Sequence, residues 1–127
     1  MTRFAMIIAA LLIAPSATQA QVLTAISGKP LKLNFSNSTN PDCTSVGETV
    51  VRLTQEPRHG KVTISKASDF PSFTKGNARR DCNKKRVAGT KTIYVSERGY
   101  LGPDSAAIEI IFPTGNTAPR SYTINVK

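Results

Sequence analysis

The sequence has no tryptophan, one histidine, two cysteines and only eight acidic residues among its 127 positions. A Ser-His-Asp triad needs a histidine base beside a nucleophile, but His59 lies in a Pro-Arg-His-Gly turn and no serine elbow is present. The acidic residues are spread along the chain, so no pair indicates glycoside cleavage. Two cysteines without further soft ligands do not make a zinc site. The sequence therefore predicts neither an enzyme nor a metal or cofactor site.

Helix signals are scarce as well. After residue 20, no stretch places apolar residues at i, i+3, i+4 and i+7 over three turns. Apolar residues alternate with other residues instead, which is typical of strands that bury one face. The residues predicted to point inward are Leu31, Leu33 and Phe35; Val51 and Leu53; Val62 and Ile64; Ile93 and Val95; Ala106, Ile108, Ile110 and Phe112; and Tyr122, Ile124 and Val126.

Turn residues separate these runs at the spacing of a β-sandwich or barrel. The turn Pro113-Thr114-Gly115-Asn116 predicts a hairpin that closes the chain. Residues 66–86 hold few apolar side chains and are predicted to be irregular. We expect most of the remaining aromatic residues to fill the core, since no tryptophan is present to do so. These aromatic residues are Phe70, Phe73, Tyr94 and Tyr100.

Residues 1–20 have the layout of a secretory signal peptide. Arg3 precedes an apolar run from Phe4 to Ala14, and a small-residue stretch ends at Ala20, where we expect cleavage. A retained membrane anchor is the weaker alternative, because a spanning helix needs about 20 apolar residues. We expect one domain, residues 21–127, in the periplasm of a Gram-negative bacterium or secreted from it. Cleavage removes Arg3 and no acidic residue, so the formal charge falls from +9 for the full chain to +8 for the domain.

The two cysteines, Cys43 and Cys82, are predicted to form a disulfide. Exported chains meet an oxidising compartment, in which an isolated pair usually becomes a bond. A redox or metal site is the alternative, but the spacing is not Cys-x-x-Cys.

Two segments carry a recognisable pattern: residues 56–62 (Glu-Pro-Arg-His-Gly-Lys-Val), and residues 94–105, which begin with Tyr94 and end in Gly-Tyr-Leu-Gly-Pro-Asp-Ser. Together they resemble the bacterial immunoglobulin-like or cadherin-like domains that occur in tandem in surface adhesins. The resemblance covers about residues 46–126 and implies an immunoglobulin-like β-sandwich of about seven short strands. It also implies that Asp104 and Ser105 cap the turn before a strand that starts near Ala106.

This sequence departs from the family pattern at several positions. Ser96-Glu97 stands where a proline is common, Ala106-Ala107 replaces the usual aromatic, and only one copy is present. The tandem domains often bind calcium at acidic junctions, which the dispersed acids here do not form. The resemblance explains neither the cysteine pair nor the basic segment that contains Cys82.

Residues 75–86 hold six basic residues and one acid, a local charge of +5. If Cys82 is bonded to Cys43, this charge is fixed to the domain, where arginine and lysine attract phosphates and carboxylates. The alternative is a solvated loop that keeps the domain soluble. Specific nucleic-acid recognition is not expected, because no aromatic side chain is interleaved for base stacking. The candidate binding residues are Lys75, Arg79, Arg80, Lys84, Lys85 and Arg86.

Taken together, these features predict an exported, non-catalytic binding module that contacts anionic glycan or lipopolysaccharide through the basic residues of segment 75–86. The alternative is a protein-interaction or adhesion subunit of the envelope, in which an exposed strand edge pairs with a partner. An inhibitor of lysozyme is disfavoured, because lysozyme is itself basic.

Overall fold

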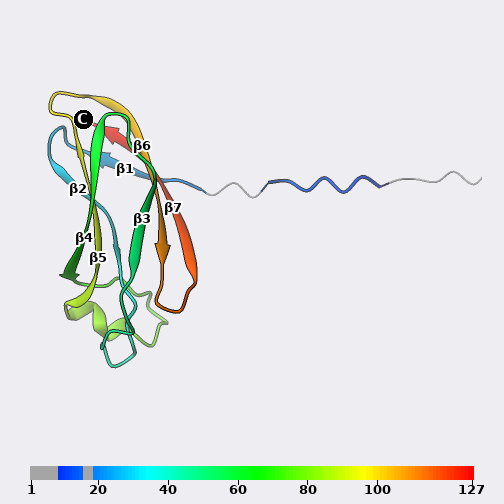
Figure 1. The fold of residues 1–127 in the computed structure, drawn as a ribbon, viewed down its shortest axis with the longest axis vertical. Helices are drawn as coiled ribbons and strands as arrows, with labels where there is room; N and C mark the ends of the chain where they lie inside the picture. The colour runs from blue at the N-terminus through cyan, green and yellow to red at the C-terminus, as the bar shows by residue number, and fades with distance from the viewer. Residues whose placement is uncertain (1–8, 16–18) are drawn as a thin grey trace, which may run out of the picture.

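A computed structural model of the chain describes residues 9–15 and 19–127. The structure is all-β, with seven strands in two sheets and one short 3-10 helix, η1 (Figure 1). This confirms the predicted all-β, sandwich-like class. The elements are β1 (Gln21–Ala25), β2 (Pro30–Ser36), β3 (Val50–Gln55), β4 (Gly60–Asp69), η1 (Arg80–Lys84), β5 (Val87–Ser96), β6 (Gly102–Ile111) and β7 (Thr117–Val126).

The two sheets face each other across one hydrophobic core. One sheet has the strand order β1-β7-β6-β3 and the other has the order β2-β5-β4. Neighbours are antiparallel except β1 and β7, which run parallel. Tyr94, Ile108 and Ile124 are the largest apolar side chains that are wholly buried, and they come from both sheets. Burial of such a shared face is the main stabilising contribution to a fold of this kind.

Period-two burial is clearest in β6 and β7. Ala106, Ile108 and Ile110 are buried on β6, and Tyr122 and Ile124 are buried on β7, while their neighbours are half-buried or exposed. The two strands pair along their full length, which confirms the predicted terminal hairpin. The inward faces predicted for β3 and β4 are also correct: Val51 belongs to the buried core, and Leu53, Val62 and Ile64 pack against it.

A bulge in β2 changes the direction of Phe35. Leu31 pairs with Tyr94 and Leu33 is buried, but the register shifts between Lys32 and Asn34. A one-residue shift turns every later side chain to the opposite face. The prediction that Phe35 points inward is therefore wrong, and its ring lies on the outer face over Gly89.

The inward face of β5 is the opposite of the predicted one. Tyr94 and Thr92 are wholly buried, whereas Ile93 and Val95 are only half-buried. Both faces of this central strand carry apolar residues, so alternation alone does not choose between them. The core takes the large ring of Tyr94, whose hydroxyl finds a buried partner in Asp104.

Two further predictions about local structure need correction. Residues 66–69 continue β4 and pair with β5, so the irregular segment begins at Phe70 and is interrupted by η1. Asp104 and Ser105 lie inside β6, which begins at Gly102 and not near Ala106. Among the aromatic residues, Tyr94 is buried and Tyr100 packs against the core as expected, while Phe70 is 45% exposed.

Residues 9–15 lie apart from the sandwich (Figure 1). They have no regular structure and extend away from the sheets, with Leu11, Leu12 and Ile13 almost fully exposed (Figure 1). The first strand begins at Gln21, the residue after the predicted cleavage site. Most of the predicted signal peptide, residues 1–8 and 16–18, lies outside the described residues. No helix in the described part of the chain is long and apolar enough to cross a bilayer.

Candidate functional site

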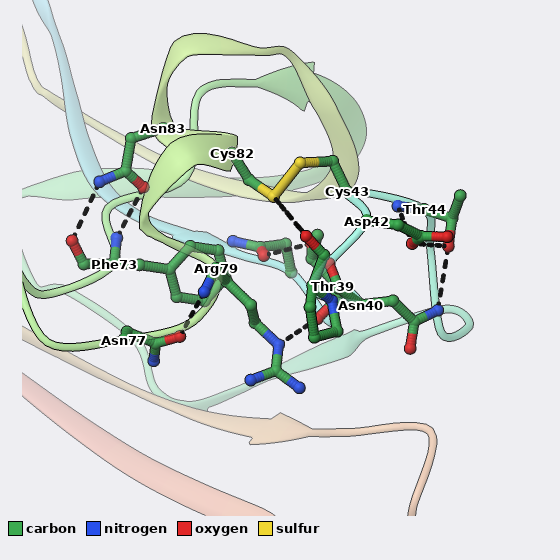
Figure 2. Close-up of a disulfide and its surroundings, with 12 residues drawn as sticks. Thr39, Asn40, Asp42, Cys43, Thr44, Phe73, Asn77, Arg79, Cys82 and Asn83 are labelled. Carbon is green, nitrogen blue, oxygen red and sulfur yellow. Dashed lines mark hydrogen bonds between the residues drawn. A yellow bond between two sulfur atoms is a disulfide. The ribbon is translucent and has the colours of Figure 1, made fainter.

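The predicted disulfide between Cys43 and Cys82 is present, with their Cα atoms 5.5 Å apart. Cys82 lies on η1 and is wholly buried, while Cys43 belongs to the connection between β2 and β3 (Figure 2). The bond therefore joins two loops that are far apart in sequence. It holds the basic segment, residues 75–86, against the end of the sandwich opposite the C-terminus (Figure 1). We call this segment the basic loop.

Side-chain hydrogen bonds fix the basic loop further. The Asn83 amide accepts a bond from the Phe73 N–H at 2.8 Å and donates one to the Phe73 carbonyl at 2.9 Å. Asn77 Oδ1 accepts a bond from the Arg79 N–H at 2.9 Å. The Arg79 guanidinium donates through Nε to the carbonyl of Thr39, so it links the two loops a second time. Figure 2 shows these contacts around the disulfide.

The facing loop is held by its own turn. The Asp42 carboxylate accepts bonds from the Thr44 hydroxyl at 2.6 Å and the Thr44 N–H at 3.1 Å. These two bonds stabilise the ionised form and lower the pKa of Asp42. Side-chain to backbone bonds of this type are typical of tight Asx turns. Both partners of the disulfide thus come from ordered loops, which limits the motion of the basic loop.

The six predicted basic residues have two kinds of surroundings. Arg79 is engaged with Thr39, and Arg86 donates to the Ser68 carbonyl at 3.0 Å while its guanidinium lies 4.9 Å from the centre of the Phe70 ring. These two arginines stabilise the loop. The side chains of the other four are exposed and make no hydrogen bond or ion pair to the described residues: Lys75, Arg80, Lys84 and Lys85.

The four exposed cations do not converge on one cavity. A 3-10 helix has 3.0 residues per turn, so Arg80 and Lys84 of η1 project about 120° apart. None of the six residues lines the four surface cavities of about 160 to 460 Å³ found in the described part of the chain. The six basic residues therefore share none of these four cavities, and the two cations on η1 point in different directions.

Acidic residues neutralise cations elsewhere on the molecule. Asp69 contacts both Lys32 and Lys91, at 3.2 and 3.1 Å. The Phe70 N–H, then Lys91 and Lys32, lower the pKa of the Asp69 carboxyl well below its usual range. Among the described residues, two further ion pairs join Arg52 to Glu109 and Lys66 to Glu48. The basic loop contains one acid, Asp81, so its charge is much less compensated than that of the sheets.

A second polar cluster surrounds Asp104 at the opposite end of the sandwich. Asp104 is only 7% exposed and accepts bonds from the Tyr94 hydroxyl at 2.7 Å and from the Arg58 and His59 N–H groups. Burial alone would raise the pKa of this carboxyl, but these bonds and one from the Ser105 N–H outweigh it and lower the pKa. Burial, followed by the bond to Asp104, raises the pKa of the Tyr94 hydroxyl.

This cluster has a structural role. Asp104 caps the turn between β3 and β4, and not the turn before β6 that the family resemblance implies. His59 in that turn stacks on Tyr100 with ring centres 4.0 Å apart. The four donated bonds hold the Asp104 carboxylate against this turn and join the turn to the start of β6. The sequence did not indicate this role, because the contact joins residues 45 positions apart.

Within the described residues, no three His, Cys, Asp or Glu side chains come close enough to hold a metal ion. A scan against protein-family models gives no match, and a search of curated proteins gives none. Among solved structures, the solution structure of Amebosin resembles the chain with a TM-score of 0.37 and 14% sequence identity. That match covers 84% of this chain and 88% of Amebosin. A likeness at this level carries no argument about fold family or function.

Proposed function

We propose that the protein is an exported, non-catalytic binding module that contacts an anionic polymer of the cell envelope, a glycan or lipopolysaccharide, through the basic loop. One observation carries the proposal. The disulfide and the Arg79 and Asn83 contacts fix the loop, while four of its cations stay exposed without an acidic partner. Fixed charges lose less conformational freedom on binding than charges on a mobile tail.

The shape of the loop favours a polymer over a small ligand. Arg80 and Lys84 project about 120° apart on η1, so we expect that one phosphate or sulfate does not contact all four cations. A polymer with repeating anionic groups can contact several at once, and binding then gains from multivalency. Such binding is expected to weaken with salt, because exposed charges are screened over about 10 Å at 0.1 M.

The strand order supports an immunoglobulin-like fold as part of this proposal. Neighbours β2-β5-β4 and β7-β6-β3 correspond to the B-E-D and G-F-C neighbours of immunoglobulin domains when letters are assigned in chain order. The first strand pairs with β7 in parallel, which places it in the second sheet. Export is supported by the start of β1 at Gln21, directly after the predicted cleavage site.

Two charge variants with equal net charge test the proposal. The loop variant replaces Lys75, Arg80, Lys84 and Lys85 by glutamine. The control variant replaces four exposed cations on other parts of the domain by glutamine as well: Lys29, Lys61, Arg98 and Lys127. Binding to lipopolysaccharide and to dextran sulfate is measured by titration calorimetry in 0.1 M salt, with neutral dextran as the blank.

We expect the loop variant to bind at least tenfold more weakly than the native chain and the control variant to change by less than threefold. Each basic residue near an anionic surface contributes about 1 kcal/mol, so losing four is easily detected. Equal weakening in both variants would mean that only net charge matters. In that case the loop is a solubility device, and the proposal is wrong.

A further inference from the structure

The four edge strands of the two sheets differ in how well they are protected. β1 has only five residues, β2 begins with Pro30 and contains a bulge, and β3 has a bulge between Leu53 and Gln55. β4 has ten residues, no proline, and a continuous register with β5 from Gly60 to Asp69. Short edges, bulges and prolines are devices that prevent strand addition, and β4 lacks these three. It does carry two lysines, Lys61 and Lys66, which give protection of the charged type.

The backbone groups that β4 directs outward can be identified. The Glu97 N–H donates to the His59 carbonyl, so His59 and Glu97 form a hydrogen-bonded pair of the antiparallel ladder. Such pairs recur every second residue, which directs the groups of residues 61, 63, 65, 67 and 69 toward β5. The groups of Val62, Ile64 and Lys66 therefore point away from the sheet. No other described residue bonds to them.

A groove accompanies this edge. Two cavities of about 240 and 160 Å³ lie along the open seam between β4 and β3, and a third of about 260 Å³ lies next to the second, lined by β4, β5 and the connection between β2 and β3. Leu53 and Val62 line the first, Ile64 and Val50 line the second, and Thr49 and Lys66 line both the second and the third. Val50 is 48% exposed although it is aliphatic. The seam thus offers apolar surface beside unpaired backbone groups.

We propose that β4 accepts an extended segment of a partner protein as an additional strand. The main chain of that segment bonds to the outward groups of Val62, Ile64 and Lys66, and its alternate side chains enter the seam beside β3. This division between backbone bonds and side-chain pockets is the usual basis of strand addition. The inference concerns a different surface from the basic loop and does not depend on the proposed function.

Charge and polarity define the chemistry of the partner segment. Its inward side chains are aliphatic where they meet Leu53, Val62 and Ile64. The same two cavities are also lined by the charged residues Glu48, Glu56, Lys61 and Lys66. Its outward side chains are acidic, because Lys61 is exposed on the outer face of β4 without an acidic partner and the domain carries a formal charge of +8. That charge also opposes pairing with a second copy through β4.

The probe is an acetylated, amidated octapeptide of alternating valine and glutamate, with a valine and lysine peptide of the same pattern as its control. Binding to the full chain is followed by titration and by amide shifts in NMR spectra. Two variants at Lys66 separate the backbone from the charge. Lys66→Pro removes both the lysine charge and the outward N–H. Lys66→Ala removes the charge but keeps the N–H. Proline is tolerated on an edge strand where its nitrogen faces outward.

We expect shifts at residues 60–69 and slower exchange of the outward amides. We also expect Lys66→Pro to weaken binding at least tenfold, Lys66→Ala to change it by less than threefold, and the lysine peptide to bind at least tenfold more weakly. Absence of binding, equal binding by both variants, or shifts confined to residues 75–86 would overturn the inference. So would a β4-mediated homodimer that does not bind the peptide.

Discussion

Removing the disulfide should strongly destabilise the domain. The bond joins Cys43 to Cys82 across a sequence separation of 39 residues. On the chain-entropy model, opening a loop of this length lowers the free energy of unfolding by about 4 kcal/mol. For a domain of this size that loss corresponds to a fall in Tm of roughly 15–20 °C. We expect these values for the double variant Cys43→Ala/Cys82→Ala.

The loss of stability should also be greatest in the segment that the disulfide holds. The bond holds the basic loop to the connection between β2 and β3, while the strands pair without it. Hydrogen exchange of residues 73–86 should therefore become faster in the variant relative to that of β6 and β7. Alanine is the suitable replacement at Cys82, because that side chain is wholly buried and a serine hydroxyl there would need a partner.

Urea unfolding measures the change in the free energy of unfolding. It is applied to the native chain, the reduced native chain and the double variant. The reduced chain and the variant should agree with each other, since both lack the same cross-link. A loss below about 1 kcal/mol would refute the reasoning. Unchanged protection of residues 73–86 would show that the Asn83 and Arg79 contacts hold the loop without the bond.

Three further changes test the packing and the buried carboxylate. Gly89→Ala should destabilise by about 1–3 kcal/mol, because a Cβ there lies 2.5 Å from the Ser36 carbonyl oxygen, whereas Gly76→Ala, with open space around it, should change urea stability little. Tyr94→Phe removes a donor to Asp104 and should cost about 1–3 kcal/mol in the same assay. Folding lowers the pKa of Asp104, so its contribution should be complete above the unfolded value of about 3.9 and lost as pH falls through the lower folded value. Unfolding measured between pH 7 and 2.5 should show a shallower dependence in Asp104→Asn, and an unchanged dependence would contradict this.

The sequence predicted the parts of the fold that depend on local alternation. On β6 and β7 one face is clearly apolar, so Ile108, Ile110 and Ile124 could be placed in the core correctly. The disulfide was also predictable, because only one pairing of two cysteines exists. These features need only short-range pattern and simple chemistry.

Other features depend on contacts that the sequence does not display. The bulge that turns Phe35 outward has no glycine or proline to mark it. On β5 the aliphatic residues Ile93 and Val95 face outward, while Tyr94 faces inward beside polar residues and bonds to Asp104, so the alternation indicated the wrong face. β1 was not predicted, because five residues without alternation become a strand only through pairing with β7.

The candidate site was predicted in composition but not in geometry. All six basic residues lie on the segment that the disulfide holds, as expected. Their division into two structural arginines and four exposed cations depends on partners in distant segments, such as Thr39 and Ser68. The Asp104 cap and the position of β4 at a sheet edge likewise follow from the topology and not from local sequence.

The most direct test of the central claim is a map of amide chemical shifts as the chain is titrated with dextran sulfate. If the immobilised basic loop is the working surface, the shifts should concentrate at residues 75–86 and at the facing residues 39–44. Shifts spread evenly over all exposed lysines and arginines, or concentrated around His59, would contradict the claim.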